Sequence, residues 1–348
     1  MARIPNAKWL SGLLTVLMIV FGIGHASAQS TTPAKQLFGG KRLPAVMPAQ
    51  AHGFYSKGCL SGGIAIATDG PYWQAMRLSR NRRWGHPALI ETIEKLSRDA
   101  ALKDGWPGLL VGDLSQPRGS PMLTGHASHQ IGLDVDIWLT PMPNRRFTAQ
   151  ERESTSAISV LKTKSVVTDP NVWTDAHGRL IMRAASYPEV QRVLVHPGIK
   201  KKLCESYTGD RKNLNKIRPY YGHHYHMHIR LHCPKNSKGC RAQKAVPAAS
   251  GCGKELDWWF DVALKPKKPA KKTSKKTTKP AKPRHIMLTD LPSACAVILN
   301  SPGPATEEAV TYRARSGAQT AYAPVKPIQS PFSMPALVPI PKERPFVQ

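Results

Sequence analysis

The chain has 348 residues, of which 50 are Lys or Arg and 22 are Asp or Glu, so its formal net charge at pH 7 is +28. Apart from an apolar run near the N-terminus, no segment is apolar for long enough to cross a bilayer, which excludes a membrane-spanning domain. The strong positive charge predicts a polyanionic partner or surface, with simple solubility as the alternative.

The N-terminus has the features of a secretory signal. Arg3 and Lys8 precede an apolar run from about residue 10 to residue 23, and the small residues Ala26, Ser27 and Ala28 follow. This order predicts a signal peptide over residues 1–28, cleaved after Ala28. An uncleaved anchor is the alternative, but the run is short for a span of about 20 residues. We therefore expect a soluble, exported mature protein.

Residues 29–53 have no hydrophobic periodicity and are expected to form an irregular lead-in. Pro87 then begins a predicted helix, because proline suits the first helical position and apolar residues follow at helical spacing: Leu89, Ile90, Ile93 and Leu96. Residues 108–111 are predicted to form a buried strand.

Farther along the chain, a helix is predicted to end near Val190, a strand to occupy residues 193–195, and another helix to begin at Pro197. Helices and strands are mixed without the regular alternation of a doubly wound sheet. The sequence therefore predicts one α+β domain over residues 54–299, with an antiparallel sheet that carries the functional site on one face and helices on the other.

Two segments, residues 125–136 and 223–231, carry the chemistry. Each includes an alternation of period two, which predicts a strand with one apolar and one polar face. The apolar positions of the two strands are Leu133, Val135, Ile137, Met227, Ile229 and Leu231. The polar positions between them are Asp134, Asp136, His226, His228 and Arg230. Such a face usually meets solvent, but His and Asp together are typical zinc ligands.

We assign one Zn²⁺ to His129, Asp136 and His228, because a catalytic zinc site uses three protein ligands and leaves a fourth position to water. Two neutral imidazoles and one carboxylate leave a net positive charge at the metal, which lowers the pKa of bound water toward about 7. His226 projects from the same strand face as His228, so it is the candidate general base.

Several neighbouring residues have more than one interpretation. A single His in a strand is usually structural, and the joint occurrence of two such segments favours the metal site. Asp134 is expected to orient a ligand or a neighbouring strand. His126 is equally well a further ligand, a substrate contact or a polar loop residue, while His224 and His232 are expected to be exposed.

These motifs resemble those of the LAS metallopeptidases, which include lysostaphin-type and D-Ala-D-Ala peptidases. The shared pattern is Ser128-x-x-x-Gly132 with His129 and Asp136, followed much later by His226-x-His228. The similarity extends from about Gly58 to about Leu299 and includes further segments in the right order: 74–77, 82–87, 125–137 and 216–219.

The resemblance implies a LAS/hedgehog-like fold with zinc on three residues: His129, Asp136 and His228. It places His126 close to the metal and implies that His226 acts as base and His223 as transition-state stabiliser. Some members hold a further metal on an Asp and a His between the two motifs, whereas residues 162–167 contain neither. We therefore expect one zinc ion per chain.

The chain has six cysteines, and an even number in an exported protein predicts three disulfides. There is no Cys-x-x-Cys pair, which argues against a zinc ribbon, and the spacing alone permits many pairings. The resemblance selects three of them: Cys59 with Cys295, Cys204 with Cys252, and Cys233 with Cys240. Residues 234–239 are also turn-forming residues, which makes the last pair plausible locally.

Residues 265–284 contain ten Lys or Arg and no acidic residue. So much charge leaves too little apolar surface for folding, and we expect a disordered basic loop that could bind polyanionic envelope surfaces. If Cys59 pairs with Cys295, the loop is tethered at both ends. Residues 300–348 are rich in Pro and Ala, which predicts a disordered tail.

The resemblance implies a periplasmic enzyme that hydrolyses the bond between D-alanine and meso-diaminopimelate in cross-linked peptidoglycan. The residues alone support metal-assisted hydrolysis at a wall-like polyanion. One alternative is a non-catalytic exported module that binds metal and wall, although pure metal storage would not need His226. Another is a metal-dependent nuclease, although phosphoryl chemistry favours Mg²⁺ held by carboxylates.

We therefore expect peptidoglycan, and not nucleic acid, as the partner. The candidate substrate contacts are Arg77, Arg83 and Arg230. The sequence leaves open whether the protein forms a homodimer.

Overall fold

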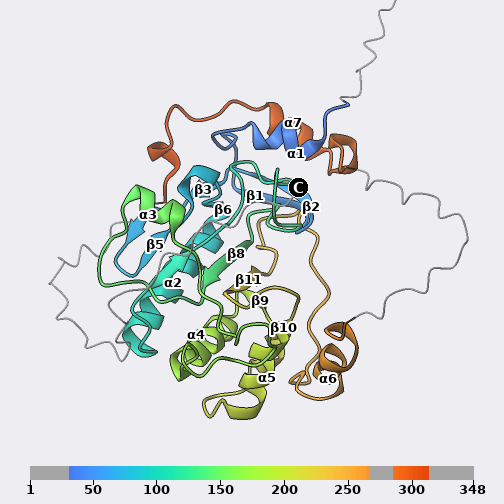
Figure 1. The fold of residues 1–348 in the computed structure, drawn as a ribbon. Helices are drawn as coiled ribbons and strands as arrows, with labels where there is room; N and C mark the ends of the chain where they lie inside the picture. Colours follow the sequence, from blue (N-terminus) through green and yellow to red (C-terminus); the bar gives the residue numbers. More distant parts are fainter. Residues whose placement is uncertain (1–30, 267–284, 313–348) are drawn as a thin grey trace, which may run out of the picture.

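The computed structural model describes residues 31–266 and 285–312 (Figure 1). The predicted signal peptide, all but the first two residues of the basic loop, and the tail beyond residue 312 lie outside these ranges. In the part of the chain that the structure describes, no helix is both long and apolar enough to cross a bilayer.

The helices and strands follow in chain order. The α-helices are α1 (Ala34–Gly39), α2 (Pro87–Lys103), α3 (Ala149–Ser154), α4 (Asp175–Ser186), α5 (Pro197–Ser206), α6 (Lys254–Trp258) and α7 (Ala294–Asn300). The strands are β1 (Gln50–Phe54), β2 (Lys57–Ser61), β3 (Ile64–Ala65), β4 (Asp69–Gly70), β5 (Trp73–Ala75), β6 (Trp84–Gly85), β7 (Leu109–Val111), β8 (Asp134–Trp138), β9 (Val190–Val195), β10 (Ile217–Pro219) and β11 (His226–Leu231). Short turns of other helix types are η1 (Leu78–Arg80), η2 (Leu214–Lys216), η3 (Trp259–Ala263), η4 (Leu288–Asp290) and η5 (Glu308–Val310).

A seven-stranded mixed sheet forms the centre, with strand order β10-β9-β11-β8-β7-β5-β4. The prediction of an α+β fold is confirmed, and the middle strands β9, β11, β8 and β7 are antiparallel. The prediction of a purely antiparallel sheet is wrong, because β10 pairs parallel with β9 and β5 pairs parallel with β7. Each parallel pair is joined by a helical crossover, through α5 and α2 respectively, as parallel strands require.

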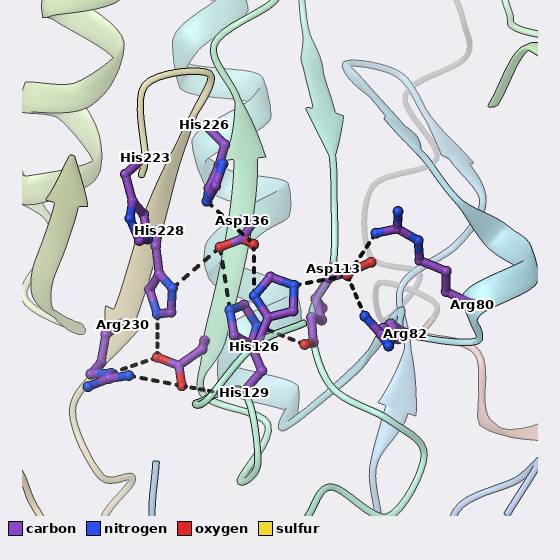
Figure 2. A network of polar contacts seen from close by, with 12 residues as sticks. Arg80, Arg82, Asp113, His126, His129, Asp136, His223, His226, His228 and Arg230 are labelled. Carbon is purple, nitrogen blue, oxygen red and sulfur yellow. Dashed lines mark hydrogen bonds and ion pairs between the residues drawn. The ribbon is translucent and has the colours of Figure 1, made fainter. Parts of the chain in front are cut away.

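The two central strands, β8 and β11, are buried along their whole length. Their apolar residues share one core with α2 and α4: Val135, Ile137, Met227, Ile229, Leu89, Ile93, Leu180 and Ile181. The polar residues that alternate with them project from the opposite side of the sheet (Figure 2). The polar face predicted from the sequence is therefore covered by protein and is not an open surface.

Most predicted elements lie where the sequence places them. The helix predicted at Pro87 is α2, and His86 caps it by accepting a hydrogen bond at Nδ1 from the backbone nitrogen of Ala88 at 3.2 Å. The helix α5 begins at Pro197 as predicted. The helix expected to end near Val190 ends at Ser186, because the residue before a proline, here Tyr187, disfavours helical backbone.

The lead-in is more ordered than its sequence predicts, because α1 and the first four residues of β1 fall within residues 29–53. Ala34 and Phe38 of α1 are buried in a small second core with Cys295 and Ile298 of α7. A six-residue helix is too short to show periodicity, and its order comes from this tertiary contact. Figure 1 shows α1 and α7 side by side at one edge of the molecule.

The three predicted disulfide pairings are confirmed: Cys59–Cys295, Cys204–Cys252 and Cys233–Cys240. The first joins β2 to α7, across a sequence separation of 236 residues. The third closes the turn directly after β11 and so fixes the end of a strand that carries site residues.

Candidate metal centre

The pairing of β8 with β11 builds the site. In their antiparallel register, Asp136 lies opposite His228 and Asp134 lies opposite Arg230. Residues that are opposite each other project to the same side of a sheet. The side chains from the two distant sequence segments therefore meet on one face (Figure 2).

Four imidazoles surround the carboxylate of Asp136. The Nε2 atom of His129 and the Nδ1 atom of His228 each lie 3.4 Å from Oδ1. On the other oxygen, Oδ2, the Nδ1 atom of His126 lies at 3.5 Å and the Nε2 atom of His226 at 3.6 Å. The sequence-predicted ligands and the predicted base thus converge on one buried carboxylate.

Two of these buried polar atoms lack a hydrogen-bond partner in the described part of the chain, although buried polar atoms normally have one. His129 Nε2 and Asp136 Oδ1 are buried and have no hydrogen-bond partner among the described residues. Leaving such groups unsatisfied is costly, so the pair calls for a further partner. Two ligand atoms that lie about 2.0–2.1 Å from one tetrahedral ion are about 3.4 Å apart, which is the separation found between them. The donor set suits a divalent ion with nitrogen and oxygen ligands.

Three residues are close enough together to hold one metal ion: His126, His129 and Asp136. Their ligand atoms all lie within 4.8 Å of one another. The sequence left three interpretations of His126 open, and the structure brings its ring against Asp136. His228 approaches the same carboxylate from β11, although the compact group does not include it.

The ring orientations of His129 and His228 leave one nitrogen of each facing Asp136. The Nδ1 atom of His129 donates to the backbone oxygen of Leu114 at 2.8 Å, which leaves the lone pair of Nε2 for the site. The Nε2 atom of His228 pairs with Asp134 Oδ1 at 2.8 Å, which leaves Nδ1. Partners of this kind fix the tautomer of metal-binding histidines. Asp134, expected to orient a ligand, contacts His228, one of the predicted ligands.

Asp134 also contacts the backbone of His129 and the side chain of Arg230. Its Oδ2 accepts from the backbone nitrogen of His129 at 3.0 Å, and its Oδ1 accepts from Arg230 Nε at 2.7 Å. Burial alone would raise the pKa of Asp134, but Arg230 and His228 hold it well below the ordinary value. His129 adopts a left-handed backbone with φ of 66°, a strained conformation that the contact with Asp134 helps to maintain.

Asp113 holds the ring of His126 in a similar way. Its Oδ2 lies 3.0 Å from His126 Nε2 and also accepts from Arg80 and Arg82, at 3.1 and 3.0 Å. Burial raises the pKa of Asp113, but the contacts with His126 and the arginines outweigh it and lower the value to about 2. Asp113 is therefore a carboxylate at physiological pH.

His223 and His226 border the cavity next to Asp136. Burial lowers the pKa of His226 to about 4, so its ring is neutral at pH 7 and can accept a proton. The Nδ1 atom of His223 donates to the backbone oxygen of Tyr221 at 2.6 Å. Burial also lowers the pKa of His223, and its backbone is left-handed with φ of 50°.

Three residues differ from their sequence-based expectations: His224 is not exposed, and Arg83 and Arg230 do not line the cavity. His232 is exposed as predicted, but His224 is half-buried, with Nδ1 2.9 Å from Ser159 Oγ. The cavity is lined by Arg77 but not by Arg83, which contacts Ile66 and Glu307, nor by Arg230, which binds Asp134.

The sequence did not point to three charged residues of the cavity: Arg80, Arg82 and Asp113. Asp113 comes two residues after the buried strand β7, and an acidic residue just beyond a buried strand is the signal that could have found it.

A cavity bordered by buried His and Asp side chains that could hold a metal ion is an arrangement that metal-dependent hydrolases use. A sequence model of the penicillin-insensitive murein endopeptidase family matches residues 51–300 of the chain. Proteins of that name from Haemophilus influenzae, Yersinia enterocolitica and Escherichia coli are 41%, 36% and 34% identical over 250, 294 and 276 residues. These alignments cover 72%, 84% and 79% of this chain and 82%, 98% and 97% of the relatives. The chain belongs to the penicillin-insensitive murein endopeptidase family.

Proposed function

We propose that this protein is an exported, zinc-dependent murein endopeptidase that hydrolyses the D-alanyl–meso-diaminopimelyl cross-link of peptidoglycan. The name of its relatives supports murein as the substrate and a peptide bond as the target. The observation that best supports a bound metal is the buried pair of His129 Nε2 and Asp136 Oδ1. These atoms have no hydrogen-bond partner within residues 31–266 and 285–312.

One Zn²⁺ would be held by His129, Asp136 and His228, with His126 as the adjacent imidazole. When bound, zinc lowers the pKa of a water ligand to about 7 and polarises the carbonyl of the substrate. The chain itself supplies imidazoles whose second nitrogens are fixed by Leu114 and Asp134, so the ligand geometry is set before the metal arrives.

His226 is the proposed general base. Its ring is neutral at physiological pH and lies beside the carboxylate ligand, on the cavity side of the site. From there it can take a proton from the attacking water and later deliver it to the leaving amine.

His223 is the proposed stabiliser of the oxyanion. In its neutral form Nδ1 donates to Tyr221, so Nε2 is an acceptor. Burial keeps the ring neutral in the free protein. It would become a donor at Nε2 only when the negative charge of the tetrahedral intermediate favours its protonation. No serine nucleophile takes part, so β-lactams, which acylate active serines, should not inhibit the enzyme.

The exported location rests on the predicted signal peptide, residues 1–28, and on a substrate that lies in the periplasm. The basic segment 265–284 would hold the enzyme at polyanionic envelope surfaces by charge. Deleting it should weaken binding to isolated sacculi at low salt and reduce the salt dependence of binding, since exposed charges are screened beyond about 8 Å at physiological ionic strength. Equal binding by the shortened protein would remove this role.

The function is tested by incubating the purified protein with cross-linked muropeptide dimers and weighing the products. We expect two monomers whose summed mass exceeds that of the dimer by one water, with a free D-alanine carboxylate on one and a free diaminopimelate amine on the other. Intact dimers, or cleavage between sugars, would contradict the proposal.

A further inference from the structure

The cavity beside the metal centre has a cationic wall that the proposed mechanism does not use. The cavity has a volume of about 690 Å³, and its lining includes three arginines from the loop between β5 and β6: Arg77, Arg80 and Arg82. Figure 2 shows Arg80 and Arg82 beyond Asp113, on the side of the site away from His228.

Acidic groups only partly balance this charge. Asp113 accepts from both Arg80 and Arg82, through the same oxygen that contacts His126. Glu153 of α3 is the next acidic group, and it binds the backbone nitrogen and hydroxyl of Ser79 at 2.9 and 2.7 Å. Glu153 does not line the cavity. Among the residues that do, three guanidinium groups stand against two carboxylates, Asp113 and the proposed metal ligand Asp136, which leaves a surplus of one positive charge before any metal is counted.

The three arginines differ in how many donors they have left. Arg82 is only 10% exposed in its side chain and is engaged by Asp113 and by both oxygens of Thr124. Arg77 donates from Nη2 to the backbone oxygen of Thr155. The side chain of Arg80 is 46% exposed and, among the described residues, donates only from Nη1, to Asp113. Its Nε and Nη2 atoms therefore remain for a ligand.

The loop that carries Arg80 is held in place. Its short turn η1 lies between two residues with left-handed backbone, Arg77 with φ of 56° and Asn81 with φ of 52°. The side chain of Asn81 accepts from Trp84 Nε1 at 2.7 Å and donates to the backbone oxygen of Arg42 at 3.0 Å. Strained backbone kept by such contacts is typical of binding sites, because it positions a side chain before the ligand arrives.

We propose that Arg80 binds a free carboxylate of the substrate, the one on the carbon that bears the nitrogen of the scissile amide. This inference rests on the proposed murein endopeptidase function, since in the D-alanyl–meso-diaminopimelyl bond that carbon carries a carboxylate. A guanidinium pairs with a carboxylate through two parallel N–H···O bonds, whereas a neutral carboxamide offers one acceptor oxygen and no charge. Arg80, positioned by Asp113, therefore makes the site selective for carboxylate over carboxamide.

The test uses two cross-linked muropeptide dimers that differ only at this group, one with the free carboxylate and one with the carboxamide. The kcat/KM for each is measured with the zinc-loaded wild-type protein, Arg80→Gln, Arg80→Lys and, as a matched control, Arg98→Gln. Arg98 is an exposed residue of α2 that does not line the cavity. Zinc content is measured for each variant, so that loss of folding is recognised.

We expect the wild-type protein and Arg98→Gln to prefer the free carboxylate by about 10- to 100-fold, the range for hydrogen bonds to charged groups. Arg80→Gln should reduce this preference to within about threefold of unity, and Arg80→Lys should restore part of it. An equal rate on both dimers in the wild type, or a preference that survives Arg80→Gln with full zinc, would overturn the inference. Failure of the wild type to cleave either dimer would overturn the proposed function and this inference with it.

Discussion

Asp136 and His228 face each other across the pairing of β8 with β11, with Oδ1 and Nδ1 3.4 Å apart. The register of the two strands thus brings a carboxylate and an imidazole together from positions 92 residues apart in the chain. If both bind the same zinc ion, removing either side chain must remove the ion, because two remaining ligands hold zinc poorly.

We therefore expect His228→Ala and Asp136→Ala to lose nearly all bound zinc, measured by plasma emission on dialysed protein. His232→Ala is the matched control, because His232 is exposed just beyond the end of β11. The control should keep about one zinc per chain. Full occupancy in either site variant would refute the ligand assignment.

Mutation can separate the role of the proposed base, His226, from that of the proposed zinc ligands. His226→Ala should keep its zinc and fold, but kcat on muropeptide dimers should fall by about 10²- to 10⁴-fold, the usual contribution of a general base. His224→Ala is the neighbouring control, since His224 contacts Ser159 outside the cavity lining. Unchanged turnover in His226→Ala would remove this residue from the mechanism.

Asp134 should tune metal affinity without touching the metal. Asp134→Asn keeps the shape of the side chain but weakens the hold on His228 and on the backbone of His129. We expect zinc affinity to fall by about 10- to 100-fold, as for other partners of metal-binding histidines. The measurement is competition with a chromophoric chelator, and the exposed Asp210→Asn serves as control. Equal affinities in wild type and Asp134→Asn would show that Asp134 does not support the ligand.

Stability should depend on the protonation of His177, a buried residue of α4. Its Nε2 donates to Leu139 and its Nδ1 accepts from the backbone of Thr174, at 3.0 Å each. Burial lowers its pKa from 6.5 to about 4. The unfolded chain therefore binds the proton at a higher pH than the folded chain, so stability decreases as the pH falls through the window from 6.5 to 4.

Between pH 7.5 and pH 5 this one residue should lower the free energy of unfolding by about 2 kcal/mol. Urea unfolding of the wild type and of His177→Gln, both with chelator present, should show a smaller pH dependence in the variant by that amount. Identical pH dependence in the two proteins would mean that His177 does not titrate as described.

The two strands of the site were predictable because their signal is local. Alternation with period two identifies β8 and β11, and the Asp and His residues at alternate positions identify the polar face. The sequence also predicts α2 and α5, because Pro87 and Pro197 mark the first turn of each helix.

Features that depend on distant contacts were not predictable in this way. The order of α1 comes from packing against α7, and the half-burial of His224 comes from Ser159. The role of Asp113 depends on its contacts with His126 and with arginines more than 30 residues earlier in the chain, which no local pattern records. The two parallel strand pairs likewise follow from the crossovers of α2 and α5, not from the strand sequences.

The central claim is that one zinc ion on this site is required for cleavage of the murein cross-link. The most direct measurement is cleavage of muropeptide dimers by chelator-stripped protein during titration with Zn²⁺. We predict no cleavage by the stripped protein and a linear return of activity that reaches its maximum at one zinc per chain. Full activity in the stripped protein, or a maximum that needs two zinc ions, would contradict the account.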